Sequence, residues 1–483
     1  MSSPIQQSMT ATHRMNRSSL FIIVAVCFLV FVGWYFVPHP VVGLAIALLP
    51  IAIIATIRML FWLILLFVVF SFFRIHEVIP QLMPFKLPLL FSLGALASIC
   101  WHLMISRTLK LVWHPAMKWL LLFWLVVILS VVFASNRGVA IHSFKGIYWK
   151  IMIMTLAIIW VVNRKEYLAK TCWTIVLAGA LVSIVALYNS AMGIGLVEGS
   201  RVTIGRAIGS MLGDPNDLAL VLLFPMGFSI SLLFSSNLHG VKRLFAGLIS
   251  FMLIAAIIAT QSRGGLLGMV AVCGYFLSQV VRSKSLLALA GAIGLLVLYI
   301  AAGISDRASG GAAEAGIDAS AMGRLYAWEA AFKMALDNPL FGVGLNNFYF
   351  NYFFYSPHWD GLNHAVHSTW FGVLAETGFL GLMLFLALIV SLLRTAQRSI
   401  KVLTQTDIHP TIKSTSPNNS KKSAPYETHG YLLSMAKAVL AGLLGTVVSG
   451  TFLTQGFVWP IYILAALIIC VAKITQNDSQ NEK

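Results

Sequence analysis

Residues 171–190 read TCWTIVLAGALVSIVALYNS, a run of 20 residues without a charged side chain. A helix of that length crosses the hydrocarbon core of a bilayer, whereas the core elements of soluble proteins are usually shorter. Similar apolar runs recur along the whole chain, in which 59% of the residues are hydrophobic and 10% are charged. A soluble domain carries about 25% charged residues, so the composition excludes an ordinary soluble enzyme. We predict a protein that crosses the membrane many times.

The apolar runs predict an all-α polytopic membrane protein with about 12–14 transmembrane helices. The runs are continuous rather than alternating, and lipid leaves no partner for unpaired backbone groups, which favours helices. The spans are expected near residues 20–37, 41–57, 59–73, 86–105, 115–134, 148–162, 171–190, 214–236, 244–260, 264–281, 285–303, 369–393, 431–454 and 457–472.

Lysine and arginine residues predict how these spans are oriented. With the N-terminus in the cytoplasm, 22 of the 33 basic residues fall on the inner side and 11 on the outer side. Cytoplasmic loops carry such an excess of basic residues. Both termini are therefore expected in the cytoplasm. The net charge of +17 is a signal of topology and predicts no binding of nucleic acid.

Two long segments separate groups of spans. Residues 304–368 are expected on the outer face, with a flexible Gly/Ala-rich start and an amphipathic helix over 320–338 that Ser320 caps. Residues 395–430 are rich in Ser, Thr, Asn, Pro and Lys, which predicts a disordered cytoplasmic linker. In chain order we expect an N-terminal bundle over 1–303, a periplasmic loop over 304–368, and C-terminal helices with the linker over 369–473.

The basic residues of the outer side are the strongest functional signal, because they oppose the usual polarity of membrane insertion. Guanidinium groups suit phosphate, since their planar fork donates two parallel hydrogen bonds. Arg201 and Arg206 lie in a Gly-rich outer loop, and Arg263 lies in a tight outer turn where a lipid-linked phosphate would also lie. The alternative for each is snorkelling at the interface or pairing with an outer acid such as Glu198 or Asp214.

His364 and His367 are the candidate proton acceptors. They are three residues apart, so both would face one side of a helix, and a helix N-terminus would keep an imidazole neutral. A neutral imidazole can act as a general base for a hydroxyl. The alternatives are an interfacial, hydrogen-bonded histidine or a metal site, for which no third ligand is evident. We predict neither a metal nor another cofactor.

The string Met211–Leu218 (MLGDPNDL) predicts the start of a span. Asp214 fits the N-cap and Pro215 fits the first helical turn. Asn216 and Asp217 would then either belong only to the helix start, or hold a sugar hydroxyl or a neighbouring arginine near the outer surface.

Four strings of the sequence carry a resemblance to one known family. His367-Ser368 is followed by nine residues and then by Gly378-Phe-Leu-Gly381, and Arg263-Gly-Gly-Leu-Leu267 lies in a tight outer turn. The other two strings are Asn338–Phe348 and GDPNDLAL. The first string resembles the HSx9GxxG-type signature of the O-antigen ligase/polymerase family, the second is similar to the outer RxxxL motif of that family, and the last two are similar to its other recurrent strings.

The resemblance implies a glycosyltransferase-C-like enzyme of the bacterial inner membrane with a periplasmic active site. Such an enzyme moves a glycan from undecaprenyl diphosphate to a hydroxyl of a glycolipid, a glycan or a protein. His367 matches the essential histidine of the family and Arg263 its diphosphate-binding arginine, whereas Arg206 and Arg324 match by loop position only. We expect His367 and Arg263 to be catalytic in a metal-independent, inverting transfer. The expected substrate-binding residues are Arg201, Arg206, Arg324, His364, Asn216 and Asp217.

Two alternatives stay open at this point. A polymerase of the same family would extend O-antigen or exopolysaccharide chains on the lipid carrier. A transporter or flippase of an anionic lipid-linked sugar would need ionisable residues in the middle of its spans. The sequence has few of these, because Lys437 and Asp217 lie near span ends and Glu376 alone lies deeper.

Overall fold

The computed structural model describes residues 40–235, 238–301, 319–359, 361–408 and 424–481, together with residues 28, 31, 32 and 35. Within this part of the chain the secondary structure is helical, apart from an isolated β-bridge between Val197 and Arg201. The all-α fold class is therefore confirmed. The α-helices are α2 (Pro40–Arg58), α3 (Leu60–Phe72), α4 (Ile75–Val78), α5 (Leu87–Cys100), α6 (Ala116–Val132), α7 (Arg137–Ser143), α8 (Trp149–Val161), α9 (Lys165–Met192), α10 (Pro215–Leu233), α11 (Gly240–Ala259), α12 (Arg263–Val280), α13 (Lys284–Ala301), α14 (Ala319–Asp337), α15 (Phe348–Tyr355), α16 (Thr369–Ile408), α17 (Ala424–Ser449) and α18 (Trp459–Asn481). Short 3-10 or π-helical segments are η1 (Pro80–Phe85), η2 (Trp101–Ile105), η3 (Phe144–Tyr148), η4 (Arg206–Ile208) and η5 (Met211–Gly213).

Many of these helices can cross a membrane. Among the described residues, 8 helical segments are long and apolar enough, or 9 if the pair Leu48–Arg58 and Leu60–Phe72, bent by 85°, forms one span. A multi-pass membrane protein is thus confirmed. Every predicted span from 41–57 onward coincides with a helix, and most of the span predicted at 20–37 lies outside the described residues. The number of crossings stays a prediction.

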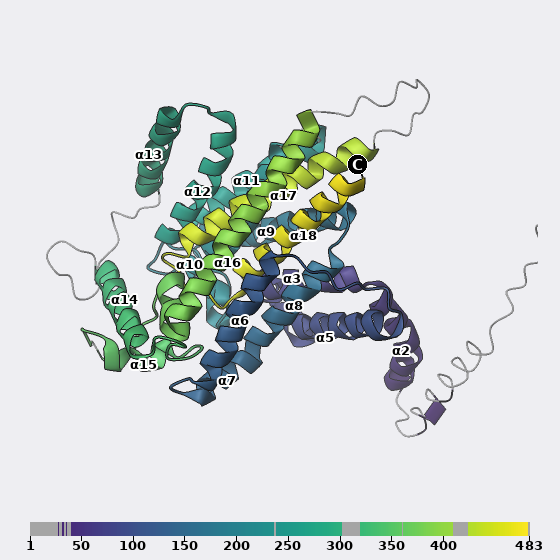
Figure 1. The fold of residues 1–483 in the computed structure, drawn as a ribbon, viewed down its shortest axis with the longest axis horizontal. Coiled ribbons are helices and arrows are strands. Elements are labelled where there is room, and N and C mark those ends of the chain that lie inside the picture. The colour runs from purple at the N-terminus through teal and green to yellow at the C-terminus, as the bar shows by residue number, and fades with distance from the viewer. Residues whose placement is uncertain are drawn as a thin grey trace, which may run out of the picture.

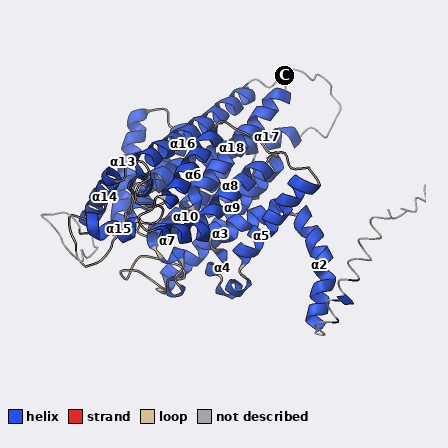
Figure 2. Cartoon of the chain, turned by 60° about the horizontal axis from the view of Figure 1, so that its bottom comes forward, coloured by secondary structure: helices blue, strands red, loops and turns tan. Residues whose placement is uncertain are grey.

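The long helices form one bundle in which α10 and α18 are central (Figures 1 and 2). The apolar windows of α10 and α18 are 83% and 89% buried. α10 packs against α9, α11 and α12 and also against α17, which comes much later in the chain. The N-terminal and C-terminal groups of helices therefore share one core. α2 lies to one side of the bundle, and α14 and α15 lie together at the other side (Figure 1).

Glycines let α10, α12 and α17 approach closely. A Cβ atom on Gly268 of α12 would lie 2.6 Å from Leu223 Cδ1 and 2.9 Å from Gly445 O. Small residues of this kind are needed where helices pack in lipid, because van der Waals contact between close backbones holds such helices together. This packing keeps the N-terminal end of α12 against α10, where the candidate site lies.

The structure corrects the predicted linker at residues 395–430. α16 continues through Ile408, because Ala396 and Leu403 are buried and extend its packed face beyond the apolar run. The segment is rich in Ser, Thr and Lys, so its composition did not reveal these two buried apolar positions. Residues 409–423 lie outside the described residues.

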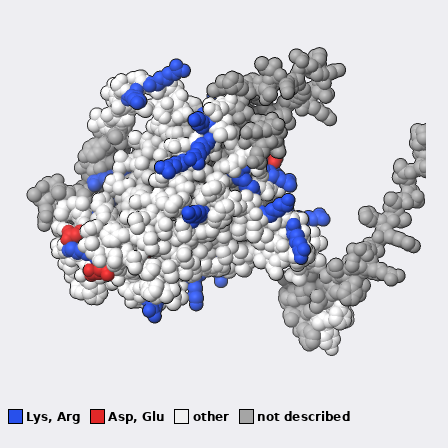
Figure 3. Space-filling view, in the orientation of Figure 1, with Lys and Arg blue, Asp and Glu red and all other residues white. Residues whose placement is uncertain are grey.

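The surface of the bundle is mostly uncharged on the face seen in Figure 3. Basic side chains lie mainly toward its upper and right parts, and most of the visible acidic ones lie at the lower left, near α14 and α15. A lipid-facing surface must avoid charge, because charged side chains are costly in the bilayer. The broad uncharged area is therefore the expected contact with lipid.

Candidate active site

The loops predicted to face outward meet at one end of the bundle. Val202 N donates to Ala259 O at 3.1 Å, which ties the loop after α9 to the end of α11. Thr369 N donates to Gly450 O at 2.8 Å, which ties the start of α16 to the end of α17. Segments far apart in the sequence thus build one surface, and most of the predicted site residues lie on them.

Asn216, at the start of α10, links two of these segments. Its Oδ1 accepts hydrogen bonds from Arg201 Nη2 at 3.1 Å and from Ser262 Oγ at 2.8 Å. Ser262 also caps α12 by accepting a hydrogen bond from Gly265 N at 3.2 Å. Because Arg263 is the first residue of α12, the same contacts hold it near Arg201. A single amide side chain therefore positions two of the predicted arginines.

Arg201 is buried, with 8% of its surface exposed. Burial lowers the pKa of its guanidinium, and the charges of Arg324 and Arg263 lower it further. The acids Glu198 and Asp214 act in the opposite direction. Glu198 Oε1 lies 3.7 Å from Arg201 Nη1, an ion pair too long for a hydrogen bond. Because the charges of Arg263 and Arg324 act on Arg201, the three guanidinium groups are close enough to interact. The alternative of pairing with Glu198 is observed for Arg201.

Arg324 reaches this cluster from α14. Its guanidinium lies 6.0 Å from the centre of the Phe452 ring, in the connection between α17 and α18. Trp328, about one turn further on, donates from Nε1 to Val366 O at 3.1 Å and stacks on Phe371 with ring centres 5.2 Å apart. These contacts hold α14 against the start of α16, so the position of Arg324 is fixed by packing.

The two faces of α14 differ in the size of their side chains. Ala327 and Ala331 are buried, which lets α14 lie close to α16, whereas Leu325 and Phe332 are exposed. The helix predicted over 320–338 is confirmed, but α14 begins at Ala319, so Ser320 lies in the first turn and is not the N-cap. The exposed apolar side is the one that we expect on the membrane surface.

His367 lies in a non-helical segment directly before α16, so the expectation of a helical His364–His367 pair is wrong. Its φ is 45°, a left-handed conformation that is unfavourable for most side chains other than Gly, Asn and Asp. The next residues are anchored by tertiary contacts that a helix here would break. Thr369 donates its amide to Gly450 O and its hydroxyl to Leu453 O, at 2.8 and 2.7 Å. His367 itself is exposed at the end of the bundle.

The surroundings of His367 favour the neutral imidazole. Loss of water around the ring lowers its pKa, and the charge of Arg324 acts in the same direction, with a smaller effect of His364. Asp214 opposes them. Because the residue keeps contact with solvent, the loss of water is incomplete, but the charge of Arg324 gives the same direction independently. Arg324 and Asp214 act on both Arg201 and His367, which places the histidine and the arginines in one electrostatic site.

The start of α10 has the geometry that its sequence predicts. Asp214 caps the helix, with Oδ1 accepting hydrogen bonds from the amides of Asn216 and Asp217 at 2.7 and 3.3 Å. Asp217 itself accepts a hydrogen bond from Gln455 Nε2 at 3.2 Å. Both predicted residues of this string are therefore connected to other parts of the site.

Arg206 and His364 each have a contact within the outer segments. Arg206 is exposed and donates from Nη1 to Gly213 O at 3.2 Å. Within the described part of the chain, no interaction joins Arg206 to the other arginines. The ring of His364 packs edge to face against Tyr352, with ring centres 5.4 Å apart.

Gln455 is a further residue of the candidate site, and it was not predicted from the sequence. It is 1% exposed. Its backbone amide donates a hydrogen bond to Thr369 Oγ1 at 2.9 Å, and its side-chain Nε2 donates one to Asp217. It therefore connects α10, the start of α16 and the segment between α17 and α18. The only signal is the polar string Thr454-Gln455-Gly456 between two apolar runs, which fits any turn equally well.

Two of the four strings that carry the family resemblance, Asn338–Phe348 and His367–Gly381, contact each other. α16 bends at Gly378, where φ is 69° and ψ is −173°, and Phe379 N donates to Pro339 O at 2.8 Å. A Cβ atom on Gly378 would lie 2.5 Å from Pro339 O. The glycine is required both by its backbone conformation and by this close approach. The bend lets the string that begins at Asn338 dock beside the first half of α16.

Glu376 has a structural role in the same docked unit. Its Oε2 accepts a hydrogen bond from Asn346 N at 2.7 Å, and its side chain is buried. Glu376, the acidic residue that lies deep in a predicted span, thus serves as the hydrogen-bond acceptor for a backbone amide of a loop. This contact removes the main support that the sequence offers for a transporter.

Replacing Gly378 by alanine is expected to destabilise the protein by about 1–3 kcal/mol. The added Cβ would clash with the backbone at Pro339, and alanine would have to adopt a φ of 69° that is unfavourable for it. The midpoint of thermal unfolding in detergent measures the effect. Gly274→Ala is the control, since a Cβ there meets nothing within 4 Å. Equal midpoints for the two variants would contradict the docked arrangement.

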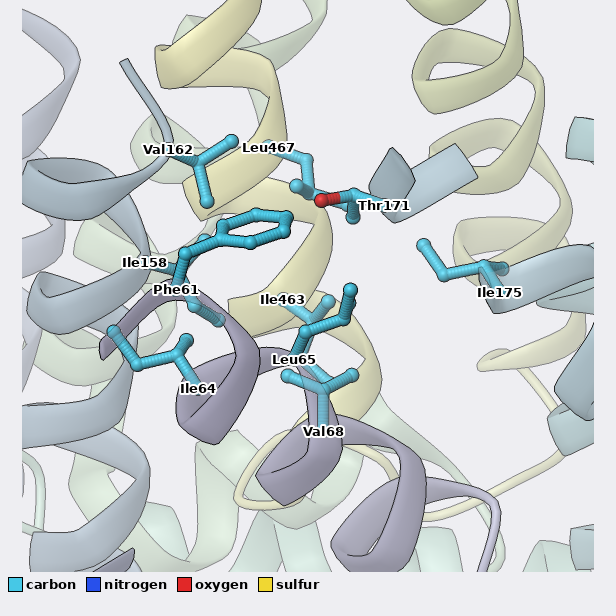
Figure 4. Close-up of a pocket in the computed structure, with 10 residues that line it drawn as sticks. All are labelled: Phe61, Ile64, Leu65, Val68, Ile158, Val162, Thr171, Ile175, Ile463 and Leu467. Atoms are coloured by element: carbon cyan, nitrogen blue, oxygen red, sulfur yellow. The ribbon is translucent and has the colours of Figure 1, made fainter. Parts of the chain in front are cut away.

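An apolar pocket between α3, α8, α9 and α18 is separate from this site (Figure 4). The side chains that line it are apolar except for Thr171. A diphosphate needs positive charge and several hydrogen-bond donors. This pocket therefore does not suit the headgroup of a lipid-linked donor.

The fold and the site together define a class, a multi-pass α-helical membrane protein whose loops place arginines near a histidine of lowered pKa at one end of the bundle. Residues 248–386 match the sequence model of a family described as O-antigen ligase. This match confirms the resemblance drawn from the motifs of the sequence. The comparison with curated proteins gave no match.

The matched segment contains Arg263, Arg324 and His367, while Arg201 and Asn216 lie before it. The hydrogen bonds of Asn216 connect the two parts. The match supports a glycosyltransferase-type activity of the O-antigen ligase/polymerase kind, with lipid-linked glycans as substrates in a membrane environment.

Proposed function

We propose that the protein transfers a glycan from undecaprenyl diphosphate to an acceptor hydroxyl on the periplasmic face of the bacterial inner membrane, in the manner of an O-antigen ligase. The observation that carries the proposal is a set of hydrogen bonds that runs from Arg201 to Asn216 and from the adjacent Asp217 through Gln455 to Thr369, two residues after His367. It combines an anion-binding group and a candidate base in one site. The periplasmic location rests on the distribution of Lys and Arg between the predicted loops.

The arginines would stabilise the leaving group. The acceptor oxygen forms a bond to the anomeric carbon while the bond from that carbon to the diphosphate oxygen breaks, and the electron pair leaves with the diphosphate. Negative charge therefore grows where Arg201, Arg263 and Arg324 gather. Charges that are already in place stabilise such a transition state without reorganisation, so the proposed transfer needs no metal. Attack from the side opposite to the leaving group inverts the anomeric centre.

His367 would take the proton of the acceptor hydroxyl. Its imidazole is exposed at the end of the bundle and close enough to Arg324 to feel its charge. A base beside the anion-binding group can receive the proton while the diphosphate departs on the other side of the sugar. Arg206 and His364 are proposed to contact the donor glycan.

The rate of transfer is expected to fall when the pH is lowered, with a midpoint below about 6.5, the ordinary pKa of histidine. The pKa of His367 is lowered, so the neutral base persists at pH 7 and is lost only when the pH falls through that lower value. The pH profile of kcat/KM for the purified protein measures the midpoint. A midpoint clearly above 6.5 would contradict the assigned base.

Glycan analysis tests the proposed function itself. Loss of a ligase leaves long chains on undecaprenyl diphosphate, whereas loss of a polymerase leaves single repeats on the acceptor. Purified protein supplied with a lipid-linked glycan and an acceptor is expected to form the new glycosidic bond. Movement of the lipid-linked glycan across a vesicle membrane without any change in its covalent structure would overturn the proposal in favour of a flippase.

A further inference from the structure

A polar pocket lies at the end of the bundle opposite to the candidate active site. It encloses about 530 Å³ between the start of α6, the second half of α16 and the end of α18. The opposite ends of α16 and α18 adjoin the candidate active site, where Thr369 at the start of α16 accepts a hydrogen bond from the backbone amide of Gln455, just before α18. We propose that this pocket binds the headgroup of an anionic phospholipid.

The charge of the pocket fits a phosphate. Arg394 and Arg398 line it, and because they are four residues apart on α16 they share one face of the helix. Among the described residues that line the pocket, none is acidic. Asp478, near the end of α18, is bound to Lys165 at 2.7 Å and does not line it. The positive charge in the pocket is therefore left for an external anion.

His114 adds a buried donor to the wall of the pocket. The residue is 6% exposed, and its Nδ1 accepts a hydrogen bond from Ala116 N at 3.2 Å. Burial lowers the pKa of His114, so the ring is neutral and carries its proton on Nε2. His114 and the two arginines line the same pocket, so together they offer a set of N–H donors suited to a phosphodiester.

An apolar strip leads from the pocket toward the middle of the membrane, which favours a lipid over a soluble anion. Leu386 and Val390 line the pocket on the same face of α16 as Arg394, and they are 43% and 42% exposed. At a rise of 1.5 Å per residue, Leu386 lies about 12 Å from Arg394 along the helix. An acyl chain can lie on this strip while its phosphate contacts the arginines. Basic pockets between transmembrane helices bind anionic headgroups in this way.

The proposal is tested by lipid binding to the purified protein. Wild type and the double variant Arg394→Gln/Arg398→Gln are titrated in detergent with phosphatidylglycerol and, separately, with phosphatidylcholine, and bound lipid is counted by native mass spectrometry. The wild type is expected to prefer phosphatidylglycerol at least roughly tenfold, and the double variant to lose roughly tenfold of that affinity. The control variant Lys242→Gln/Lys401→Gln removes two exposed charges outside the pocket and is expected to bind as the wild type.

Four results would overturn the proposal. The first is equal affinity of the wild type for the two lipids, a measurement that depends on no variant. The second is an equal loss of affinity in the control variant. The third is displacement of phosphatidylglycerol by micromolar inorganic phosphate, which would identify a site for a free anion. The charge-preserving variant Arg394→Lys/Arg398→Lys is expected to keep most of the affinity, and its failure to bind would contradict a charge-based site.

Discussion

Replacing His367 by asparagine is expected to lower the rate of glycan transfer by about 10²–10⁴-fold, the usual contribution of a general base. Asparagine is the informative choice because it tolerates the left-handed conformation, with φ of 45°, that His367 adopts. The variant removes the imidazole without adding backbone strain, whereas His367→Ala changes both. We expect both variants to be present in the membrane at normal levels and to be inactive to a similar extent.

The measurement is single-turnover transfer by purified protein with a lipid-linked glycan and an acceptor. His358→Ala is the control, because His358 lies in the same outer segment but stacks on Tyr326, with ring centres 5.1 Å apart. It is expected to keep nearly full activity. If His367→Asn also kept full activity, the imidazole would not be the base, and the proposed mechanism would fail at its first step.

The helices were predictable because lipid makes their sequence signal strong. A run such as 171–190 has no partner for its backbone in the bilayer except itself, so the helix follows from length and composition. The cap at Asp214 was predictable for a similar reason, since an Asp-Pro pair at the start of an apolar run has few other local uses. Both predictions depend on neighbours in the sequence and need no knowledge of tertiary contacts.

The contacts of the site could not be predicted in this way. His367 is not helical because Thr369 is bound to Leu453 and Gln455, which are 84 and 86 positions away in the chain, and no local pattern encodes those bonds. Similarly, α14 packs through Ala327 and Ala331, while its larger apolar residues stay exposed. Periodicity locates an apolar face, but close packing selects small residues, and that choice depends on the partner helix.

The basic residues in the outer loops predicted the location of the candidate site, but they did not predict which arginines lie together. Arg201 and Arg206 are five residues apart in one loop, yet Arg201 turns inward to Asn216 and Arg206 binds Gly213 O. We therefore expect a larger loss of activity from Arg201→Ala than from Arg206→Ala, an order that the sequence alone does not give.

Replacing Arg263 by alanine is expected to lower kcat by about 10²–10³-fold, the usual cost of removing one preorganised group that stabilises developing negative charge. Arg263 is the first residue of α12, and the cap formed by Ser262 and the close packing at Gly268 fix its position. A side chain held in place before the reaction stabilises the leaving diphosphate more than it stabilises the bound donor. The loss should therefore appear mainly in kcat, with a smaller rise in KM.

Arg263→Lys separates charge from geometry. Lysine keeps the charge but lacks the planar fork that binds two phosphate oxygens, so we expect only partial recovery of the rate. Lys333→Gln is the control, since this outer residue of α14 binds Glu329 at 2.8 Å and its removal should leave transfer unchanged. Binding of free undecaprenyl diphosphate gives a second readout that a purely structural role would not change. If Arg263→Ala kept both full transfer and full affinity for that product, the arginine cluster would not be the diphosphate site, and the anion at this end of the bundle would have to bind elsewhere.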